Sequence, residues 1–441
     1  MSSCRSPAAF LAFLLFVAGC AAPIADAPDP TGPPTTPSTG AGPPASPPPR
    51  SQSAIAETIE RLQAAIDANP SDAAAQRDLG FALLQRVRET ADPALYARAE
   101  AAYERARALD PDDALVLVGI GSLHLGKHEF AAALESARRA IVMAPRLAVA
   151  RAIEVDALVE LGRYDEADGA AAEMLALVSD LTTLSRVSYL AELHGQLDVA
   201  VTAMRQATTS AGAAPENLAF THAQLGNLLV YAGDPAAATT EYDRALELVP
   251  GHAPALAGHG RLAVAAGRLD EAITRFRQAA DLVPLPEYVI ALADAQAAAG
   301  RADDAAHSIE LARAEIQLFE ATGVTVDLDL ALFEADHGDP KRALAFAETA
   351  YAEAPNVRAA DARAWALHRL GRDDEARVYA DEALRLGSRD PLLRFHAGAI
   401  AAALGDDAAA RRDLDLALST DPGFSATHAA EARRLLESLG D

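Results

Sequence analysis

The stretch APALAGHGRLAVAAGRLDEAITRFRQAADLVP, residues 253–284, decides the fold of this chain. Gly267 lies in its middle, and a glycine tolerates at low cost the left-handed conformation that ends a helix. Ala272 and Ala279 are seven residues apart, so they lie on one face of a second helix and allow it to pack closely. Pro284 ends that second helix, because proline cannot donate the next backbone hydrogen bond. The stretch predicts a helical hairpin.

The same three positions recur along the chain. Six glycines lie 34, 33, 38, 33 and 34 residues apart, and each has an alanine five residues on and another twelve residues on. Gly195 follows the same rule, and Gly162 follows it until Met174 takes the second alanine position. Eight copies predict one helical hairpin repeated along the chain. The six glycines are Gly233, Gly267, Gly300, Gly338, Gly371 and Gly405.

Acidic residues after the glycines are expected to begin the second helices, by capping free N–H groups and facing the positive end of the helix dipole. At Asp234 and Asp339 the next residue is proline, which suits the first helical position. Acidic pairs elsewhere have the composition of catalytic carboxylates or calcium ligands, but they stand at turns and helix starts, where capping explains them. The residues expected at helix starts are Asp165, Asp198, Asp270 and Asp303, and the pairs are Asp112-Asp113, Asp303-Asp304, Asp373-Asp374 and Asp406-Asp407.

This pattern resembles the tetratricopeptide repeat, whose 34-residue signature has Leu-Gly, a glycine before the turn, alanine, an aromatic residue, alanine and a closing proline. Leu225-Gly226 and Phe276 supply the Leu-Gly and the aromatic residue here. The resemblance implies an all-α, right-handed superhelical solenoid of about ten hairpins over residues 53–441, acting as one cooperative body. A lone helix at Ala54–Ala68 and a capping helix at Thr427–Leu439 are expected at its ends. Extra residues leave the repeat register open near 86–97, 211–217 and 319–327.

The first 52 residues predict a targeting signal followed by a spacer. Residues 1–19 have a cation and a short apolar stretch typical of a secretory signal peptide. Val17-Ala18-Gly19-Cys20 resembles the lipobox of bacterial lipoproteins, which implies that the Cys20 thiol receives the lipid; an ordinary signal peptide with an incidental Cys20 is the alternative. Residues 20–52 are rich in Pro, Thr, Ser and Gly, and the expectation is a disordered, semi-extended spacer.

Composition excludes several classes of protein. The chain has 63 acidic and 38 basic residues and a formal charge of −25. Nucleic-acid binding is therefore not expected, because it requires clustered Lys and Arg. The two cysteines, Cys4 and Cys20, exclude a disulfide framework and a cysteine-based zinc module.

Catalytic motifs are weak. Ser122 lacks the Gly-x-Ser-x-Gly turn of a hydrolase. His124 and His128, with Glu129 beside them, have the spacing of metal ligands on a helix, but Gly126 between them indicates that the helix ends there. We expect no enzyme activity, no metal and no cofactor.

Candidate binding residues come from the first helices of the hairpins, which in the repeat family commonly face a concave groove. Trp365 is the single tryptophan, and Trp, Tyr and Arg contribute much of the binding energy at protein interfaces. Packing between hairpins is the alternative role for Trp365. The candidate groove residues are Arg77, Asn227, Tyr231, Arg261, Arg358, Trp365 and Arg369.

These patterns predict a membrane-anchored, non-enzymatic scaffold lipoprotein in the bacterial cell envelope. It would face the extracytoplasmic side of a cell membrane, in the periplasm or at the cell surface. Its partners would be protein or peptide segments of the envelope, bound in the groove. A soluble-ligand sensor coupled to a membrane partner is the first alternative, and a metal-dependent enzyme using His124 and His128 is the second.

Overall fold

The computed structural model describes residues 54–210 and 214–440, which form 22 helices. Cys20 and the predicted signal peptide and spacer lie outside the described residues. The described ranges contain no strand, and none of their helices combines the length and apolarity needed to cross a bilayer. The helices are α1 (Ala54–Ala68), α2 (Ala73–Thr90), α3 (Ala94–Leu109), α4 (Ala114–Gly126), α5 (Phe130–Met143), α6 (Ala148–Glu160), α7 (Tyr164–Leu177), α8 (Leu181–Leu193), α9 (Leu197–Ala207), α10 (Pro215–Tyr231), α11 (Pro235–Leu248), α12 (Ala253–Ala265), α13 (Leu269–Leu282), α14 (Pro286–Ala298), α15 (Ala302–Ala321), α16 (Asp327–His337), α17 (Pro340–Glu353), α18 (Val357–Arg369), α19 (Asp373–Ala383), α20 (Pro391–Ala403), α21 (Asp407–Thr420) and α22 (His428–Ser438).

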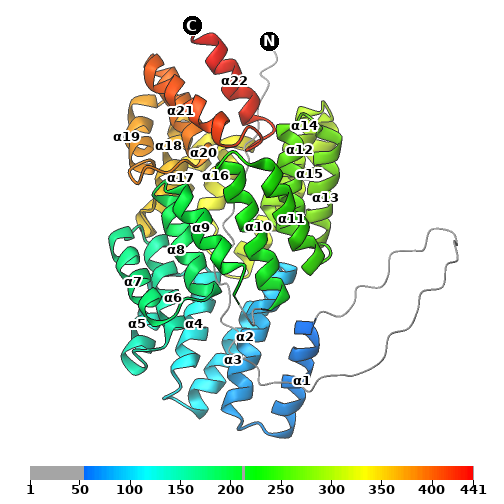
Figure 1. Ribbon diagram of the computed structural model, residues 1–441, viewed down its shortest axis with the longest axis vertical. Coiled ribbons are helices and arrows are strands. Elements are labelled where there is room, and N and C mark those ends of the chain that lie inside the picture. The colour runs from blue at the N-terminus through cyan, green and yellow to red at the C-terminus, as the bar shows by residue number, and fades with distance from the viewer. Residues whose placement is uncertain (1–53, 211–213, 441) are drawn as a thin grey trace, which may run out of the picture.

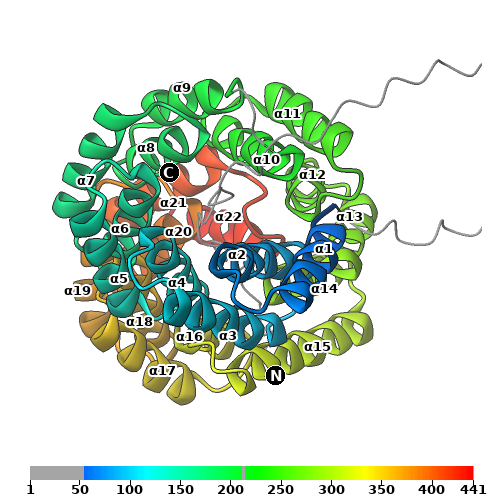
Figure 2. The ribbon, with the colours of Figure 1, turned by 90° about the horizontal axis from the view of Figure 1, so that it is seen from below.

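The helices form ten consecutive antiparallel hairpins, from α2 with α3 to α20 with α21, and α1 and α22 lie at the two ends (Figure 1). The predicted all-α solenoid of about ten hairpins is therefore confirmed. Seen along its axis, the first helices of the hairpins make the inner ring and the second helices the outer ring (Figure 2). Helix α22 lies toward the middle of the ring.

The predicted stop signals are found where expected. Seven helices end two residues before a proline, because the residue that precedes a proline is disfavoured in the α region. Seven of the eight repeat glycines have positive φ, while Gly338 is the exception with φ −134°. The seven prolines are Pro70, Pro111, Pro145, Pro250, Pro284, Pro355 and Pro422.

The helix starts correct part of the prediction. Asp234 and Asp339 are N-caps whose side chains accept backbone N–H groups, as expected. Asp165 and Asp270, by contrast, lie in the first turn of α7 and α13, and the N-cap positions belong to Arg163 and Arg268. Asp198 and Asp303 lie in the first turns of α9 and α15 in the same way. These carboxylates therefore face the helix dipole but do not cap.

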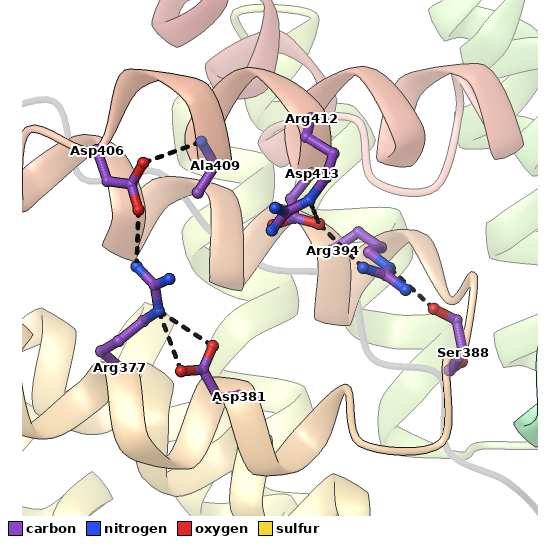
Figure 3. Close-up of polar contacts among 8 residues, drawn as sticks. All are labelled: Arg377, Asp381, Ser388, Arg394, Asp406, Ala409, Arg412 and Asp413. Carbon is purple, nitrogen blue, oxygen red and sulfur yellow. Dashed lines mark hydrogen bonds and ion pairs between the residues drawn. The ribbon is translucent and has the colours of Figure 1, made fainter.

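In the acidic pair Asp406-Asp407, Asp406 caps α21, as expected, and also contacts the preceding hairpin (Figure 3). Asp406 Oδ1 accepts the Ala409 backbone N–H at 3.1 Å, and its Oδ2 contacts the Arg377 guanidinium of α19 at 3.3 Å. Arg394 of α20 reaches Asp413 of α21 at 2.9 Å. The Arg377 contact therefore connects the two final hairpins, while the Arg394 contact joins the two helices of the last hairpin.

Large aromatic rings packed on glycines hold neighbouring hairpins together. The Tyr242 side chain of α11 is fully buried between α10 and α12. A Cβ added at either Gly226 or Gly258 would lie 2.4 Å from the Tyr242 ring, so only glycine fits at both positions. Tyr103 has the same place between Gly80 and Gly119. Aromatic residues of the second helices are therefore buried against glycines of the first helices.

The solenoid makes more than one turn, and its loops then meet residues far back in the sequence. Asn356 Nδ2 donates to the Glu160 carbonyl at 2.7 Å, and the Val357 N–H donates to the Tyr164 hydroxyl at 3.0 Å, across 196 and 193 residues. The Thr325 N–H donates to the Lys127 carbonyl at 3.1 Å. We call this line of contacts between successive turns the inter-turn seam. At roughly 34 residues per hairpin, one turn takes just under six hairpins.

Glycine is required at two points of this seam. Gly162 has φ +71°, and a Cβ there would lie 2.4 Å from the Pro355 carbonyl oxygen. Gly195 has φ +69°, and its Cβ would lie 2.4 Å from the Gly387 carbonyl oxygen. The repeat glycines Gly233 and Gly267 have the same conformation but nothing within 4 Å. Two of the repeat glycines therefore also allow the turns to approach closely.

The extra residues of the sequence mainly lengthen helices. Helix α2 has 18 residues, α10 has 17 and α15 has 20. The segment 323–326 is a loop between α15 and α16, as expected. This loop contacts the end of the α4–α5 hairpin and so contributes to the inter-turn seam.

Candidate functional site

A cavity of about 590 Å³ lies beside the inter-turn seam. Its walls come from α2 to α6 in the first turn of the solenoid and from α14 to α18 in the second. Binding pockets for small molecules and peptide side chains commonly have volumes of about 300–1,000 Å³. We call it the inter-turn cavity, because neither turn of the solenoid forms it alone.

Local sequence brings the second-turn wall into place. Asn356 caps α18: its Oδ1 accepts the N–H groups of Arg358 and Ala359 at 3.0 and 2.8 Å. The same amide donates to the Glu160 carbonyl of the first turn. The Asn356 side chain therefore caps a helix in the second turn of the solenoid and attaches that helix to the first turn. It also directs Arg358 toward the cavity.

Apolar side chains cover most of the cavity wall. Ile316 and Val326 are buried, and Phe319 and Leu161 are partly exposed. Such a lining favours ligands that carry apolar groups. The apolar lining includes Leu84, Val87, Phe130, Leu161, Leu285, Ile316, Phe319, Val324, Val326 and Leu328.

The charged groups of the cavity are mostly carboxylates. Although burial opposes it, the nearby Glu160 and Asp329 carboxylates hold the pKa of the Arg358 guanidinium above its usual value. Burial raises the pKa of Glu160 and of Asp329. Glu287 follows Pro286 at the start of α14, and burial raises its pKa to about 8. Burial in the cavity therefore favours the protonated, neutral form of these carboxyl groups.

The predicted groove residues do lie on first helices, but only Arg358 lines the inter-turn cavity. Arg77 pairs with Asp78 and with Asp113, at 2.7 Å for the second contact. Asn227 accepts hydrogen bonds from the Tyr242 hydroxyl and from Arg261. These residues stabilise contacts between neighbouring hairpins.

Tyr231 and Arg369 also lie outside the cavity lining. Tyr231 is a buried residue at the end of α10. The Arg369 Nε donates to the Ala335 carbonyl at 2.9 Å. The seven candidate residues therefore do not form one site.

Trp365 packs in the core, which corrects its suggested place in an open groove. Its side chain is 1% exposed, and its Nε1 donates to Asp336 Oδ1 at 2.8 Å. The indole stacks on the His396 ring with 4.1 Å between centroids. Of the two alternatives for this residue, packing between hairpins is the one observed.

The cavity carboxylates Glu160, Glu287 and Asp329 were not anticipated from the sequence. Each is isolated in its own repeat, and Asn356 and Glu160 are brought together across 196 residues. No local motif signals such a meeting. The position of Glu287 directly after Pro286 marks it as a helix-start residue, but not as part of a cavity.

His124 and His128 have separate partners. His124 Nδ1 lies 2.5 Å from Glu129 Oε2, while His128 Nδ1 lies 2.6 Å from the Thr325 carbonyl oxygen across the seam. Within the part of the chain that the structure describes, no group of three or more His, Cys, Asp or Glu side chains has a metal-binding arrangement.

The sequence model of the tetratricopeptide repeat family matches three ranges of this chain, residues 94–148, 224–284 and 257–317. These ranges include the hairpin in which Phe276 packs on Gly260. These parts of the chain are similar to tetratricopeptide repeats. No curated protein matches this repeat chain in sequence.

Solved structures share the repeat architecture at low identity. A tetratricopeptide repeat protein from Parabacteroides merdae is 17% identical, with a TM-score of 0.35, over 59% of this chain and 99% of that protein. Yeast Tom70 is 14% identical, with a TM-score of 0.31, over 83% of this chain and 95% of its own. YrrB, a tetratricopeptide protein with an unusual peptide-binding site, is 23% identical, with a TM-score of 0.27. The match covers 45% of this chain and 97% of YrrB.

Proposed function

We propose that this repeat protein is a non-enzymatic scaffold that binds extended protein segments in its inter-turn cavity. The observation that carries the proposal is the cavity itself: it has the volume of a binding pocket, a mostly apolar wall and a few charged groups. A partner segment would contact side chains of both turns at once. Its binding would therefore also stabilise the seam.

We further propose that the protein is anchored by lipid at Cys20 to a bacterial cell membrane and faces the extracytoplasmic side. The support is the match of residues 17–20 to a lipobox. Two or more acyl chains suffice for stable anchoring without a membrane-spanning helix. The residues between Cys20 and α1 would hold the solenoid away from the bilayer.

Photocrosslinking in intact envelopes tests the scaffold. A photoreactive amino acid at Phe319, inside the cavity, is expected to capture a defined set of envelope proteins. The matched control is Val142, which is 81% exposed on α5, on the outer ring. Equal capture from both positions would contradict a partner site in the cavity.

The anchor is tested separately. Cys20→Ser is expected to release the protein from membranes into the soluble fraction. Unchanged membrane retention of that variant would refute lipidation at Cys20 and leave the scaffold proposal intact.

A soluble-ligand sensor is the second candidate, and the size of the inter-turn cavity favours it. Native mass spectrometry of protein purified from its own host distinguishes the two. A retained small molecule, lost when Ile316 is replaced by Trp to fill the cavity, would favour the sensor.

A further inference from the structure

The inter-turn cavity has more carboxyl groups than basic groups. Six carboxylates line it, against the guanidinium groups of Arg88 and Arg358 and the imidazole of His128. Glu129 has its own partners, His124 at 2.5 Å and Lys127 at 3.2 Å. Even with that residue set aside, carboxyl groups outnumber basic groups in the lining. The six are Glu129, Glu160, Glu287, Asp327, Asp329 and Glu353.

Glu287 is the carboxylate that most needs a partner. It is 8% exposed, and although its side chain shares a hydrogen bond with Tyr288, its Oε2 atom has no hydrogen-bond partner in the described chain. Leaving a buried polar atom without a partner costs about 1–3 kcal/mol, and more for a charged group. A bound ligand with a hydrogen-bond donor would remove this cost.

The surroundings of Glu287 define the donor. Leu285 and Pro286 precede it, and Ile316 and Phe319 of α15 contribute to the same cavity. A cation on a flexible apolar stem fits this environment, because its methylenes contact apolar walls while its head reaches the carboxylate. Lys and Arg side chains have this form.

We propose that the inter-turn cavity selects a Lys or Arg side chain of an otherwise apolar, extended peptide segment and pairs it with Glu287. This inference rests on the proposed scaffold function and specifies its partner. The peptide backbone would lie along the seam, and its apolar neighbours would cover Leu161 and Phe319. The overall negative charge of the chain would attract such segments at low salt.

Panning a random peptide display library against the complete chain tests the proposal. Enriched peptides are expected to carry a Lys or Arg flanked by apolar residues. Enrichment of peptides without a basic residue would overturn the inference but preserve the scaffold. A library that yields no binder would overturn both.

Fluorescence anisotropy with the most enriched peptide then locates the contact. Replacement of its basic residue by Met is expected to weaken binding at least tenfold. Glu287→Gln, which keeps the shape of the side chain, is expected to weaken the basic peptide to the same level and to leave the Met peptide unchanged. Binding of the basic peptide that is unaffected by Glu287→Gln would overturn the assignment.

Two further variants control for folding and for net charge. Glu160→Gln removes a second carboxylate of the same cavity, so it should also weaken the basic peptide, by a smaller factor. Glu104→Gln makes the same change on the exposed face of α3 and should have no effect. Equal losses in Glu104→Gln and Glu287→Gln would show a general charge effect and contradict a specific pocket.

Discussion

Two kinds of packing hold this solenoid together, and they differ in chemistry. Between neighbouring hairpins, rings such as that of Tyr242 are buried against glycines of the adjacent helices. Across the inter-turn seam, backbone carbonyls and an amide meet, as between Glu160 and Asn356. The first kind buries apolar area and so supplies stability. The second fixes how closely the turns approach, and thereby shapes the cavity.

The largest effect is expected at a buried ring. Tyr242→Ala should destabilise the fold by about 3–5 kcal/mol, since the ring would leave a cavity between two glycines that cannot fill it. Urea denaturation followed by circular dichroism measures the change.

Tyr242→Phe is the matched control. It keeps the ring and loses the hydrogen bond from the hydroxyl to Asn227, which spans 2.8 Å, together with the hydroxyl's contact with Arg261. It should cost about 0.5–1.5 kcal/mol. If the Ala and Phe variants were equally stable, ring packing would not be the main attachment between hairpins.

The second prediction separates the seam from the hairpins. Gly162→Ala and Gly267→Ala both place a side chain at φ +71°, so both should lose roughly 1–2 kcal/mol from strain. Only Gly162→Ala also meets the Pro355 carbonyl oxygen, at 2.4 Å. Its radius of gyration in X-ray scattering should therefore rise, while that of Gly267→Ala should not.

Asn356→Asp provides an independent test of the seam. The carboxylate can still cap α18, but it cannot donate to the Glu160 carbonyl. The helix should persist in circular dichroism while the molecule expands. If neither this variant nor Gly162→Ala expands the molecule, the seam does not hold the turns together.

The sequence predicts the hairpins because each depends on residues within about one repeat. Gly267, Ala272 and Pro284 define a helix end, a packing face and a stop without reference to the rest of the chain. The lone helix predicted on this local basis, Ala54–Ala68, has the same bounds in the structure. The acidic helix starts were misplaced by two positions because a carboxylate is favourable both as a cap and in the first turn.

The seam and the cavity depend on the total rotation between the first and second turns of the solenoid, which no single repeat determines. Small rotations between successive hairpins add up over nearly six of them before Gly162 meets Pro355. Trp365 illustrates the same limit within one helix. Its first-helix position is compatible with an open groove, but α20 brings His396 onto the indole, and α22 brings His428 beside it. Whether a first-helix residue is exposed is therefore a property of the assembled superhelix.

The third prediction compares carboxylates of the inner and outer rings as pH changes. Burial, with a smaller contribution from Asp390, raises the pKa of Glu192 on α8 to about 8. Between its ordinary pKa and about 8, the folded chain then binds more protons here than the unfolded chain. Stability should therefore fall as pH rises from 6 to 8.5, with Glu192 contributing at most about 1.4 kcal/mol per pH unit.

Glu192→Gln should reduce this slope. The matched control is Glu271→Gln on the exposed face of α13, where a hydrogen bond from Arg268 lowers the pKa of Glu271. That carboxylate is ionised in both folded and unfolded chains over this pH range, so the control should leave the slope unchanged. Denaturation midpoints measured at several pH values give the slope of stability against pH for each variant. An equal slope in Glu192→Gln and the parent would contradict the prediction.

The smallest effect is expected at the exposed edge between the last hairpins. Arg377 and Asp406 have side chains 34% and 43% exposed, so Arg377→Ala should cost under about 1 kcal/mol. Arg394→Ala should cost more, because its partner Asp413 is 3% exposed and would keep only the contact with Arg412. If the two substitutions were equally costly in urea denaturation, exposed ion pairs would have to be counted with the buried rings as a source of stability. A small cost at Arg377, between hairpins, alongside a larger one at Arg394, within the last hairpin, would instead assign the stability from ion pairs to groups that are removed from water.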